Sequence, residues 1–360
     1  MDAANIVIAL PAARRRNFGT VLAVVAALAI ALVFWTQQRY PALTKKLHAG
    51  AQVQVRGSIS FDALLAVNPA MPVAERVGRT AVNWVWTNRF GMYFALPFGA
   101  VIMTLLGTGL GAKRFRSPAA NVLCGAVAGM PLGVCSNCAT PIGQGLLAGG
   151  ASSRLTVAAM ISSPSFNPVV LTMVFVLFPL PLAWARVLVP SLLLVLLPVL
   201  VKENDPQVRT ITMPGEPESA LQQTSAFLRS FGSNLVRLVL LTLPWMIMAA
   251  ALGAVLAEAI PAYGTHLPVS ALGVIAVAVL GTLLPVPMAL DVALAFVLYR
   301  SGVPTPYVAA LLCTLGPLSV YSLSALAQQL GRSTALRLGA ALIALGCVAG
   351  WVAMIWPAGS

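Results

Sequence analysis

The chain has 360 residues, of which 59% are hydrophobic and only 9% are charged, and its formal net charge is +13. Soluble domains carry about 25% charged residues, so the composition excludes a soluble protein and indicates an all-α membrane protein with several crossings. The basic residues lie mostly at the ends of apolar segments, as the positive-inside rule describes, so the charge does not indicate nucleic-acid binding. With nine acids and two histidines, a conventional metalloenzyme has few ligands, and we expect no cofactor.

The first predicted element is an N-terminal anchor helix within residues 1–36. Arg14 to Arg16 precede an apolar run of about 18 residues, close to the length of a spanning helix. We expect it to enter from the cytoplasm and to stay uncleaved, because no small-residue cleavage site follows it. Residues 37–90 predict an outer segment of mixed polarity, in which residues 73–90, with Trp84 and Trp86, form a helix at the membrane interface.

The first membrane repeat is expected over residues 91–201, and it begins with a helix over residues 91–111. Its central stretch is MPLGVCSNCATPIGQGLLAGG, residues 130–150. The 33 residues from 118 to 150 are too few for two crossings, and prolines and glycines interrupt them. We therefore expect a re-entrant hairpin with CSNCAT at its tip. A helix broken at SSPSFNP and an intact helix over residues 182–201 follow.

The second half repeats this order of elements. Residues 202–234 are hydrophilic and predict a cytoplasmic linker, and the second membrane repeat is expected over residues 235–360. It holds a helix (235–256), a hairpin broken at PVP (270–299), a helix broken at Gly316-Pro317 (303–330) and a last helix (335–356). Corresponding points lie about 145 to 153 residues apart. Counting the crossings gives the hairpins opposite openings, so we expect two inverted-topology repeats with a substrate site between the interrupted segments.

Cys135 and Cys138 form a C-x-x-C pattern at the expected tip of the first hairpin. Three interpretations are open: packing as small apolar side chains, binding of a thiophilic solute such as trivalent arsenic or a soft metal ion, and a redox dithiol. The surrounding prolines and glycines strengthen the functional interpretations beyond what the spacing alone supports.

Polar residues accompany the cysteines at both interruptions of the first repeat. They either bond helix to helix or form the polar wall of a cavity, and we favour the cavity. Pro164 and Pro168 would free backbone carbonyls there as acceptors for a cation or a substrate donor. The expected substrate-binding residues are Cys135, Ser136, Asn137, Cys138, Thr140, Pro141, Ser163, Pro164, Asn167 and Pro168.

Asp291 is the only acid well inside an apolar stretch. Carboxylates within a membrane are costly and commonly serve proton or ion coupling, so we expect Asp291 to couple transport to proton movement. The alternative is a structural ion pair with Arg186 or another basic residue. For Arg186 itself, we expect a side chain that extends to the membrane interface.

The run from residue 129 to residue 168 resembles the predicted-permease family of bacterial inner membranes that includes the organoarsenical efflux permeases. That family carries P-x-C-S-C-x-x-x-P, then L-x-x-x-G-A, then S-P-x-x-N-P. Here Asn137 stands in place of the family's second cysteine, Pro131 lies two residues too early for the leading proline, and residues 37–90 are an addition. The resemblance implies a permease without fixing its cargo. The matching residues are Cys135, Ser136, Pro141, Leu146, Gly150, Ala151, Ser163, Pro164, Asn167 and Pro168.

These observations predict a secondary transporter rather than an enzyme, located in the bacterial inner membrane with a cytoplasmic N-terminus. We expect it to export a small, thiophilic solute or ion with proton coupling. Two alternatives stay open: a membrane thiol oxidoreductase that uses Cys135 and Cys138, and a non-transporting subunit of an envelope complex. Residues 37–90 are the segment through which an envelope partner or a second copy of the chain would bind.

Overall fold

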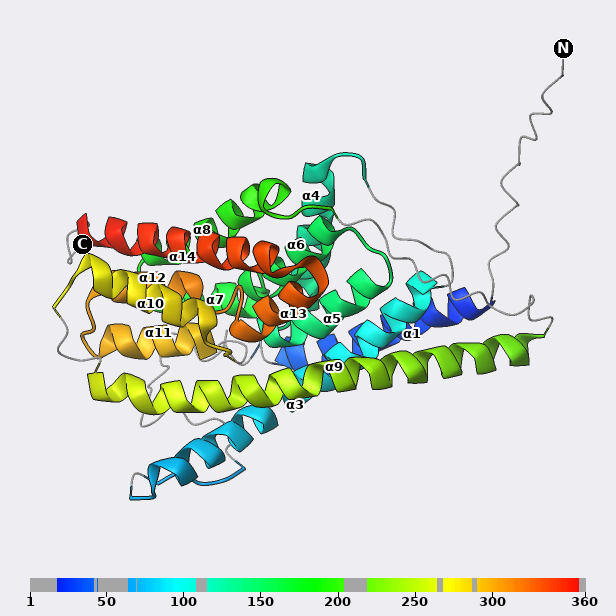
Figure 1. Cartoon of the computed structure of the whole chain (residues 1–360), viewed down its shortest axis with the longest axis horizontal. Coiled ribbons are helices and arrows are strands. Elements are labelled where there is room, and N and C mark those ends of the chain that lie inside the picture. The colour runs from blue at the N-terminus through cyan, green and yellow to red at the C-terminus, as the bar shows by residue number, and fades with distance from the viewer. Residues whose placement is uncertain are drawn as a thin grey trace, which may run out of the picture.

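A computed structural model of the chain describes residues 18–41, 44, 64–68, 70–107, 115–203, 219–263, 268–286 and 290–355, and the regular secondary structure in these ranges is helical (Figure 1). Some predicted features lie outside these residues. They are Arg14 to Arg16, most of residues 42–63, most of the linker (204–218) and residues 287–289 of the second hairpin.

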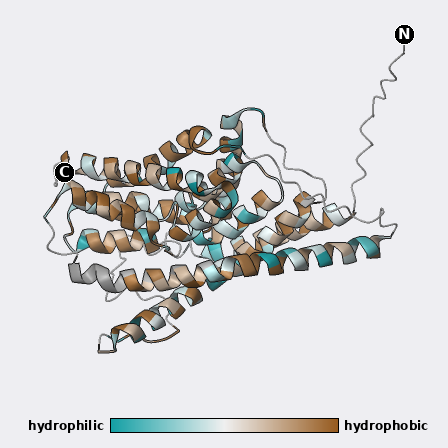
Figure 2. Cartoon of the chain, viewed as in Figure 1, coloured by the Kyte–Doolittle hydropathy of each residue, from teal (hydrophilic) through white to brown (hydrophobic). Residues whose placement is uncertain are grey.

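Five helical segments in the described ranges are long and apolar enough to cross a membrane. A sixth is the pair α6 (Ser153–Ser165) and α7 (Pro168–Leu177), which bend by 43° at their junction. Apolar residues cover much of the outward surface of these helices (Figure 2), so the chain is a multi-pass membrane protein. The five segments lie in α1 (Phe18–Phe34) with its π-helical extension η1 (Trp35–Arg39), α3 (Val73–Gly107), α8 (Leu180–Leu200), α9 (Ala220–Tyr263) and α14 (Arg332–Ile355).

Shorter helices occupy the places where the sequence predicts interruptions. The region that the sequence predicts as the first hairpin, called the first hairpin below, consists of α4 (Pro118–Gly129), a 3-10 turn η3 (Met130–Leu132) and α5 (Ser136–Ala148). The region predicted as the second hairpin, called the second hairpin below, contains α10 (Ala271–Leu283) and α11 (Leu290–Arg300). The second broken helix comprises α12 (Thr305–Thr314) and α13 (Val320–Leu330). Local sequence explains the ends. Ser117 caps α4, with Pro118 in its first turn, and Gly133 takes a left-handed φ of 58° directly after η3.

The two halves share one order of helices, displaced by a constant 152 residues (305 minus 153). This displacement separates the first residues of α6 and α12, of α7 and α13, and of α8 and α14, and the last residues of α5 and α11. The turns after α5 and α11 also match, because Gly150 and Gly302 have φ values of 84° and 82° and the same pair of backbone hydrogen bonds closes each turn. Such regularity indicates that both halves are built on one fold.

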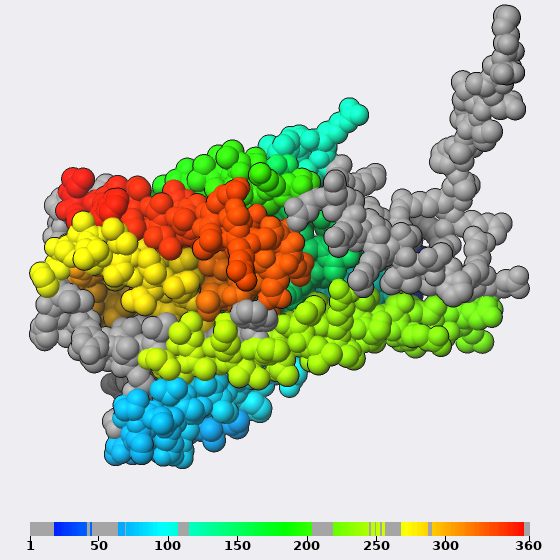
Figure 3. Space-filling model, viewed as in Figure 1, coloured from blue at the N-terminus to red at the C-terminus, as the bar shows by residue number. Residues whose placement is uncertain are grey.

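The halves interlock through their broken helices. In Figure 1, α4, α5 and α6 lie toward one end of the bundle and α10, α11 and α12 toward the other, whereas α7 contacts α11 and α13 contacts α5. The helices α8 and α14 contact each other, and α3 packs along α9, which runs the length of the face in Figure 3. One buried apolar cluster contains side chains of both halves, among them Ile161, Leu193, Leu318 and Leu338.

Two helices are longer than the sequence predicts. The helix α3 runs from residue 73 to residue 107 without a break, so the separate helices expected over residues 73–90 and 91–111 are one helix. Likewise, α9 begins at Ala220 and passes through the boundary expected at residue 235. Both predicted boundaries were placed where the hydropathy of the sequence changes. No proline stands at either position, so no residue there removes a backbone hydrogen bond of the helix, and each helix continues although Gly91 and Gly232 are weak helix formers.

Close packing of α4 on α6 gives the first prediction. A Cβ on Gly125 would lie 2.0 Å from the carbonyl oxygen of Leu155, a backbone atom that cannot move aside. We expect Gly125→Ala to destabilise the protein by about 1–3 kcal/mol through overpacking, measured as a lower unfolding temperature in detergent. The matched control is Gly232→Ala on α9, where a Cβ meets nothing within 4 Å and helix propensity favours alanine. Equal stability of the two variants would contradict this packing.

Candidate functional site

The tip of the first hairpin is held by the interruption of the first broken helix. Gly133 reverses the chain after η3, and Val134 follows outside any helix. The Ser163 hydroxyl lies 3.1 Å from the Val134 nitrogen, from which it accepts a hydrogen bond, and 3.3 Å from the Val134 carbonyl, to which it donates. One side chain of α6 therefore bonds both backbone groups of this non-helical residue.

The two cysteines lie side by side at the start of α5. Cys135 is the N-cap residue and Cys138 lies in the first turn, and their sulfur atoms are 3.3 Å apart. Both thiols are buried. The Cys135 sulfur lies 3.8 Å from Oδ1 of Asn88 on α3. On the same helix, a Cβ on Gly91 would come within 2.4 Å of the Cys138 sulfur, so only glycine lets α3 approach the pair this closely.

Asn137 connects the first hairpin to both interruptions of the second half. Its side chain is fully buried. Its amide nitrogen donates to the Val286 carbonyl at 3.3 Å, and its Oδ1 accepts from the Ser319 hydroxyl at 3.1 Å. Ser319 is the N-cap of α13. The structure thus brings the first tip, the second hairpin and the second broken helix together at one amide.

The other predicted site residues have mainly local contacts. The Thr140 hydroxyl donates to the Ser136 carbonyl in its own helix, and Asn167 caps α7 by accepting from the Val169 nitrogen at 2.9 Å. The hydroxyl of Ser136 is buried without a hydrogen-bond partner among the described residues. The three prolines keep different places: Pro141 lies inside α5, Pro164 lies inside α6, and Pro168 begins α7.

Asp291 forms a buried ion pair with Arg186, which lies on α8 of the other half. The Arg186 side chain is fully buried, so the expectation that it extends to the membrane interface is wrong. Its guanidinium also donates to the carbonyls of Leu312 and Leu315 at 2.8 and 2.6 Å, which end α12. These bonds explain the burial, because α12 ends at this interruption and its last carbonyls need a donor. The ion pair with Arg186, which was the structural alternative for Asp291, is therefore present in the structure.

Several residues around this site were not predicted. The Trp84 indole donates to the Pro285 carbonyl at 2.9 Å, and the Trp35 indole donates to the Pro131 carbonyl. Asn88 and Ser319, described above, also belong to this group. The available signal was a polar or indole side chain at the edge of an apolar run, which is too common to single these residues out. Among the described residues, no group of three His, Cys, Asp or Glu side chains could hold a metal ion.

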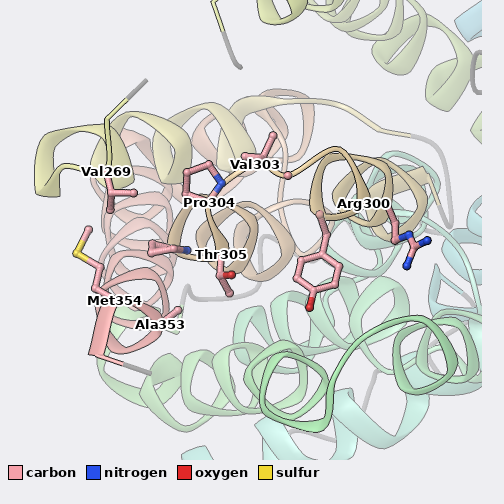
Figure 4. A pocket seen from close by; sticks show the side chains of 10 residues that line it. Val269, Arg300, Val303, Pro304, Thr305, Ala353 and Met354 are labelled. Atoms are coloured by element: carbon pink, nitrogen blue, oxygen red, sulfur yellow. The ribbon is translucent and has the colours of Figure 1, made fainter. Parts of the chain in front are cut away.

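A separate pocket of about 890 Å³ lies where the turn between α11 and α12 meets the end of α14 (Figure 4). Its walls are largely apolar, with Val269, Val303 and Met354 among the lining residues, and Arg300 stands at its side. None of the ten lining residues is a predicted site residue. The pocket is thus distinct from the site at the hairpin tip.

The fold and site define a class, a multi-pass helical membrane protein whose two similar halves meet around buried polar side chains. Comparison with known proteins supplies the family, since residues 100–355 match the model of a family described as predicted permease. The chain belongs to this predicted permease family, so the resemblance of residues 129–168 is confirmed. It is also similar to the UPF0718 protein YraQ of Escherichia coli (strain K12), with 29% identity over 253 residues, or 69% of this chain and 70% of that protein. No solved structure matches the chain.

The ion pair between the halves gives the second prediction. Arg186→Met leaves the buried Asp291 carboxylate without its arginine and is expected to cost about 3–5 kcal/mol of stability. The double variant Arg186→Met/Asp291→Leu should regain a large part of this loss, because it removes both charges. Denaturant titration of the purified proteins measures both. The control is Arg337→Gln, an exposed residue that bonds Ser333 of its own helix, which should change stability by less than about 0.5 kcal/mol. A double variant no more stable than Arg186→Met would contradict the pairing.

Proposed function

We propose that this permease is a secondary transporter that exports a small thiophilic solute, such as a trivalent organoarsenical or a soft metal species, across the bacterial inner membrane. The thiol pair of Cys135 and Cys138, buried where the two halves meet, carries the proposal. The proposed binding residues are those that the sequence predicts from Cys135 to Pro141 and from Ser163 to Pro168.

The separation of the two sulfurs supports a trivalent cargo. With sulfur bonds of about 2.3 Å, as in zinc thiolates, an atom that bridges sulfurs 3.3 Å apart would have an angle of about 90° between them. Tetrahedral ions need about 109°. An angle near 90° suits the pyramidal geometry of trivalent arsenic or antimony, whose lone pair occupies the remaining direction. The two thiols can thus hold such an atom without rearrangement.

The short helices support a passage between the halves. α4 and α5, of 12 and 13 residues, are about 20 Å long, against about 30 Å for the hydrocarbon core. We infer that they form a re-entrant hairpin, and that α10 and α11 form its counterpart in an inverted second repeat. Interrupted backbone at such depth requires contact with protein or with a water-filled cavity. A polar site between the interruptions would serve as the substrate site.

The coupling role of Asp291 is part of the proposal. Arg186 on α8 and Asp291 on α11 join the two halves at the second interruption. Protonation of Asp291 would remove its attraction for Arg186 and loosen this connection, whereas deprotonation would restore it. Because the pair involves the first half, the second hairpin and α12 together, a change in its charge can alter how the halves pack.

The outer segment supports a contact with another protein. The first part of α3 projects beyond the bundle (Figure 3), and residues 64–68 fold back on it, since Asn83 exchanges two hydrogen bonds of 2.8 Å with the Leu65 backbone. We propose that residues 37–90 bind either a second copy of the chain or an envelope partner. This role is compatible with transport and does not require it.

The third prediction concerns transport by the thiol pair. In everted membrane vesicles, Cys135→Ser and Cys138→Ser should each reduce accumulation of phenylarsine oxide at least tenfold, because one thiolate cannot chelate the arsenic atom. Arsenic content of the washed vesicles measures the uptake. Cys124→Ser, on α4 outside the tip, serves as control and should transport like the wild type. Wild-type uptake by both tip variants would exclude the thiols from binding.

The same proteins test the oxidoreductase alternative, which the sulfur separation of 3.3 Å also favours. Gel-shift trapping should find both thiols reduced in growing cells if they bind cargo. Cycling between thiol and disulfide forms, together with unchanged uptake by the serine variants, would establish a redox function instead.

The fourth prediction concerns coupling. Asp291→Asn keeps the size of the side chain but removes the charge, so we expect vesicles with this variant to accumulate cargo only to equilibrium. A protonophore should reduce wild-type accumulation and leave the variant unaffected. Glu203→Gln is the matched control, because that acid bonds Ser152 and Ser153 at the start of α6, away from the ion pair of Asp291. Equal protonophore sensitivity of Asp291→Asn and wild type would remove Asp291 from the mechanism.

A further inference from the structure

Arg39 lies against the tip of the first hairpin, although it belongs to the end of the first helix. Its Cδ and Nε atoms lie 3.6 and 3.7 Å from the place that a Cβ on Gly133 would take, and its guanidinium carbon lies 4.4 Å from the centre of the Phe34 ring. Trp35 of the same turn donates to the Pro131 carbonyl. The end of the first helix is thereby fixed to the residues that precede Cys135.

Arg39 brings a positive charge to this tip, and no acid among the described residues forms an ion pair with it. The arginine–acid pairs in the described part of the chain are Arg79–Glu75, Arg154–Glu203 and Arg186–Asp291, and Arg39 is in none of them. Its Nε is buried and has no hydrogen-bond partner among the described residues. A buried N–H group is stable when it is hydrogen-bonded, so the half-buried Arg39 leaves its Nε available to an anionic ligand.

The start of α5 adds to the positive potential at the tip. The Arg39 side chain lies against Gly133, two residues before Cys135 in the chain. Cys135 is the N-cap of α5, so the first backbone N–H groups of this helix have no partner within it, and the N-terminal end of a helix carries a partial positive charge. The first hairpin tip therefore favours a ligand with negative charge close to the sulfurs.

Binding of a trivalent arsenical to the thiols does not supply that charge. An arsonous acid R–As(OH)₂ reacts with two thiols to give R–As(S–Cys)₂ and two molecules of water. Two As–O and two S–H bonds break, two As–S bonds form, and each hydroxyl leaves with a thiol proton. The resulting dithioarsonite is neutral, and no oxidant or reductant is consumed. The positive charge of Arg39 is then not neutralised when the arsenical binds, unless the substituent R is anionic.

We propose that the cargo carries, beside its thiophilic atom, a negatively charged group such as a carboxylate, which Arg39 binds. This inference rests on the proposed function, because it uses the thiol pair as the other half of the recognition. Arginine suits the task because its planar fork donates two parallel hydrogen bonds to a carboxylate. Arg39 also precedes residues 100–355, the part that matches the family model, so the specificity would be a property of this chain's first helix.

A binding experiment on the purified full chain tests the inference. Phenylarsine oxide and its 4-carboxyl derivative differ only in the charged group, and both are titrated into the protein in detergent. The indoles of Trp35 and Trp84 bond the two hairpin regions, so their fluorescence reports the binding. The wild type should bind the carboxylated compound at least about tenfold more tightly, as expected for one hydrogen-bonded charge pair.

Variants separate charge recognition from folding. Arg39→Gln should lose the preference for the carboxylated compound while its affinity for phenylarsine oxide stays unchanged, which also shows that the variant is folded. Arg39→Lys should keep part of the preference. Arg89→Gln is the matched control, because Arg89 also stacks on an aromatic ring, Trp86 at 3.9 Å, and it should retain the full preference.

The outcomes distinguish this inference from the proposed function. If both compounds bind the wild type equally and Cys135→Ser abolishes binding, the thiol site stands and the role of Arg39 is overturned. A preference that persists in Arg39→Gln also overturns it. If neither compound binds the wild type, the proposed function is overturned, and the inference that rests on it is overturned as well.

Discussion

The structure depends on one constraint: backbone groups freed at the interruptions of the short helices must find partners inside the protein. Ser163 bonds both backbone groups of Val134. In the second half, Asn137 bonds the Val286 carbonyl, and Trp84 and Arg186 bond other freed carbonyls of its hairpin and its broken helix. All three of these second-half interactions use side chains of the first half. The interruptions therefore hold the two halves together, because these carbonyls of the second half are bonded by side chains of the first half.

The ion pair of Arg186 and Asp291 shows why such an interaction is kept although it is expensive to bury. Desolvation of two charges offsets most of their attraction, so the pair contributes little net stability compared with apolar side chains of the same volume. It does specify an arrangement, because Arg186 must reach the end of α12 and Asp291 at once. A bond that fixes geometry without adding much stability is suited to a junction whose packing changes during a transport cycle.

Much of the fold and part of the site can be predicted from the sequence, for identifiable physical reasons. Pro168 stands at the start of α7 and Gly133 takes a left-handed φ directly after η3, so these two interruptions are local properties, whereas Pro141 and Pro164 lie inside helices. The family resemblance likewise depends on a contiguous stretch. The partners of Asn137 and Asp291 are different, because they lie 182 and 105 residues away along the chain, and no local pattern encodes such contacts. The length of α3 was missed because a change of hydropathy at residue 90 resembles a helix boundary, whereas the backbone continues.

The two halves have the same order of helices, but their functional side chains differ. At the displacement of 152 residues (305 minus 153), Cys135 corresponds to Pro287, Cys138 to Leu290, and Ala139 to Asp291. The first hairpin has thiols and no acid, and the second has an acid and no thiols. Both lead to the same short stretch, since Asn137 beside the thiols bonds Ser319 and Arg186 beside the acid bonds Leu315. A displacement of residues 315–319 would thus affect the thiol site and the Arg186–Asp291 ion pair together. Coupling of an ion to a thiol-bound cargo requires such a connection between the two sites.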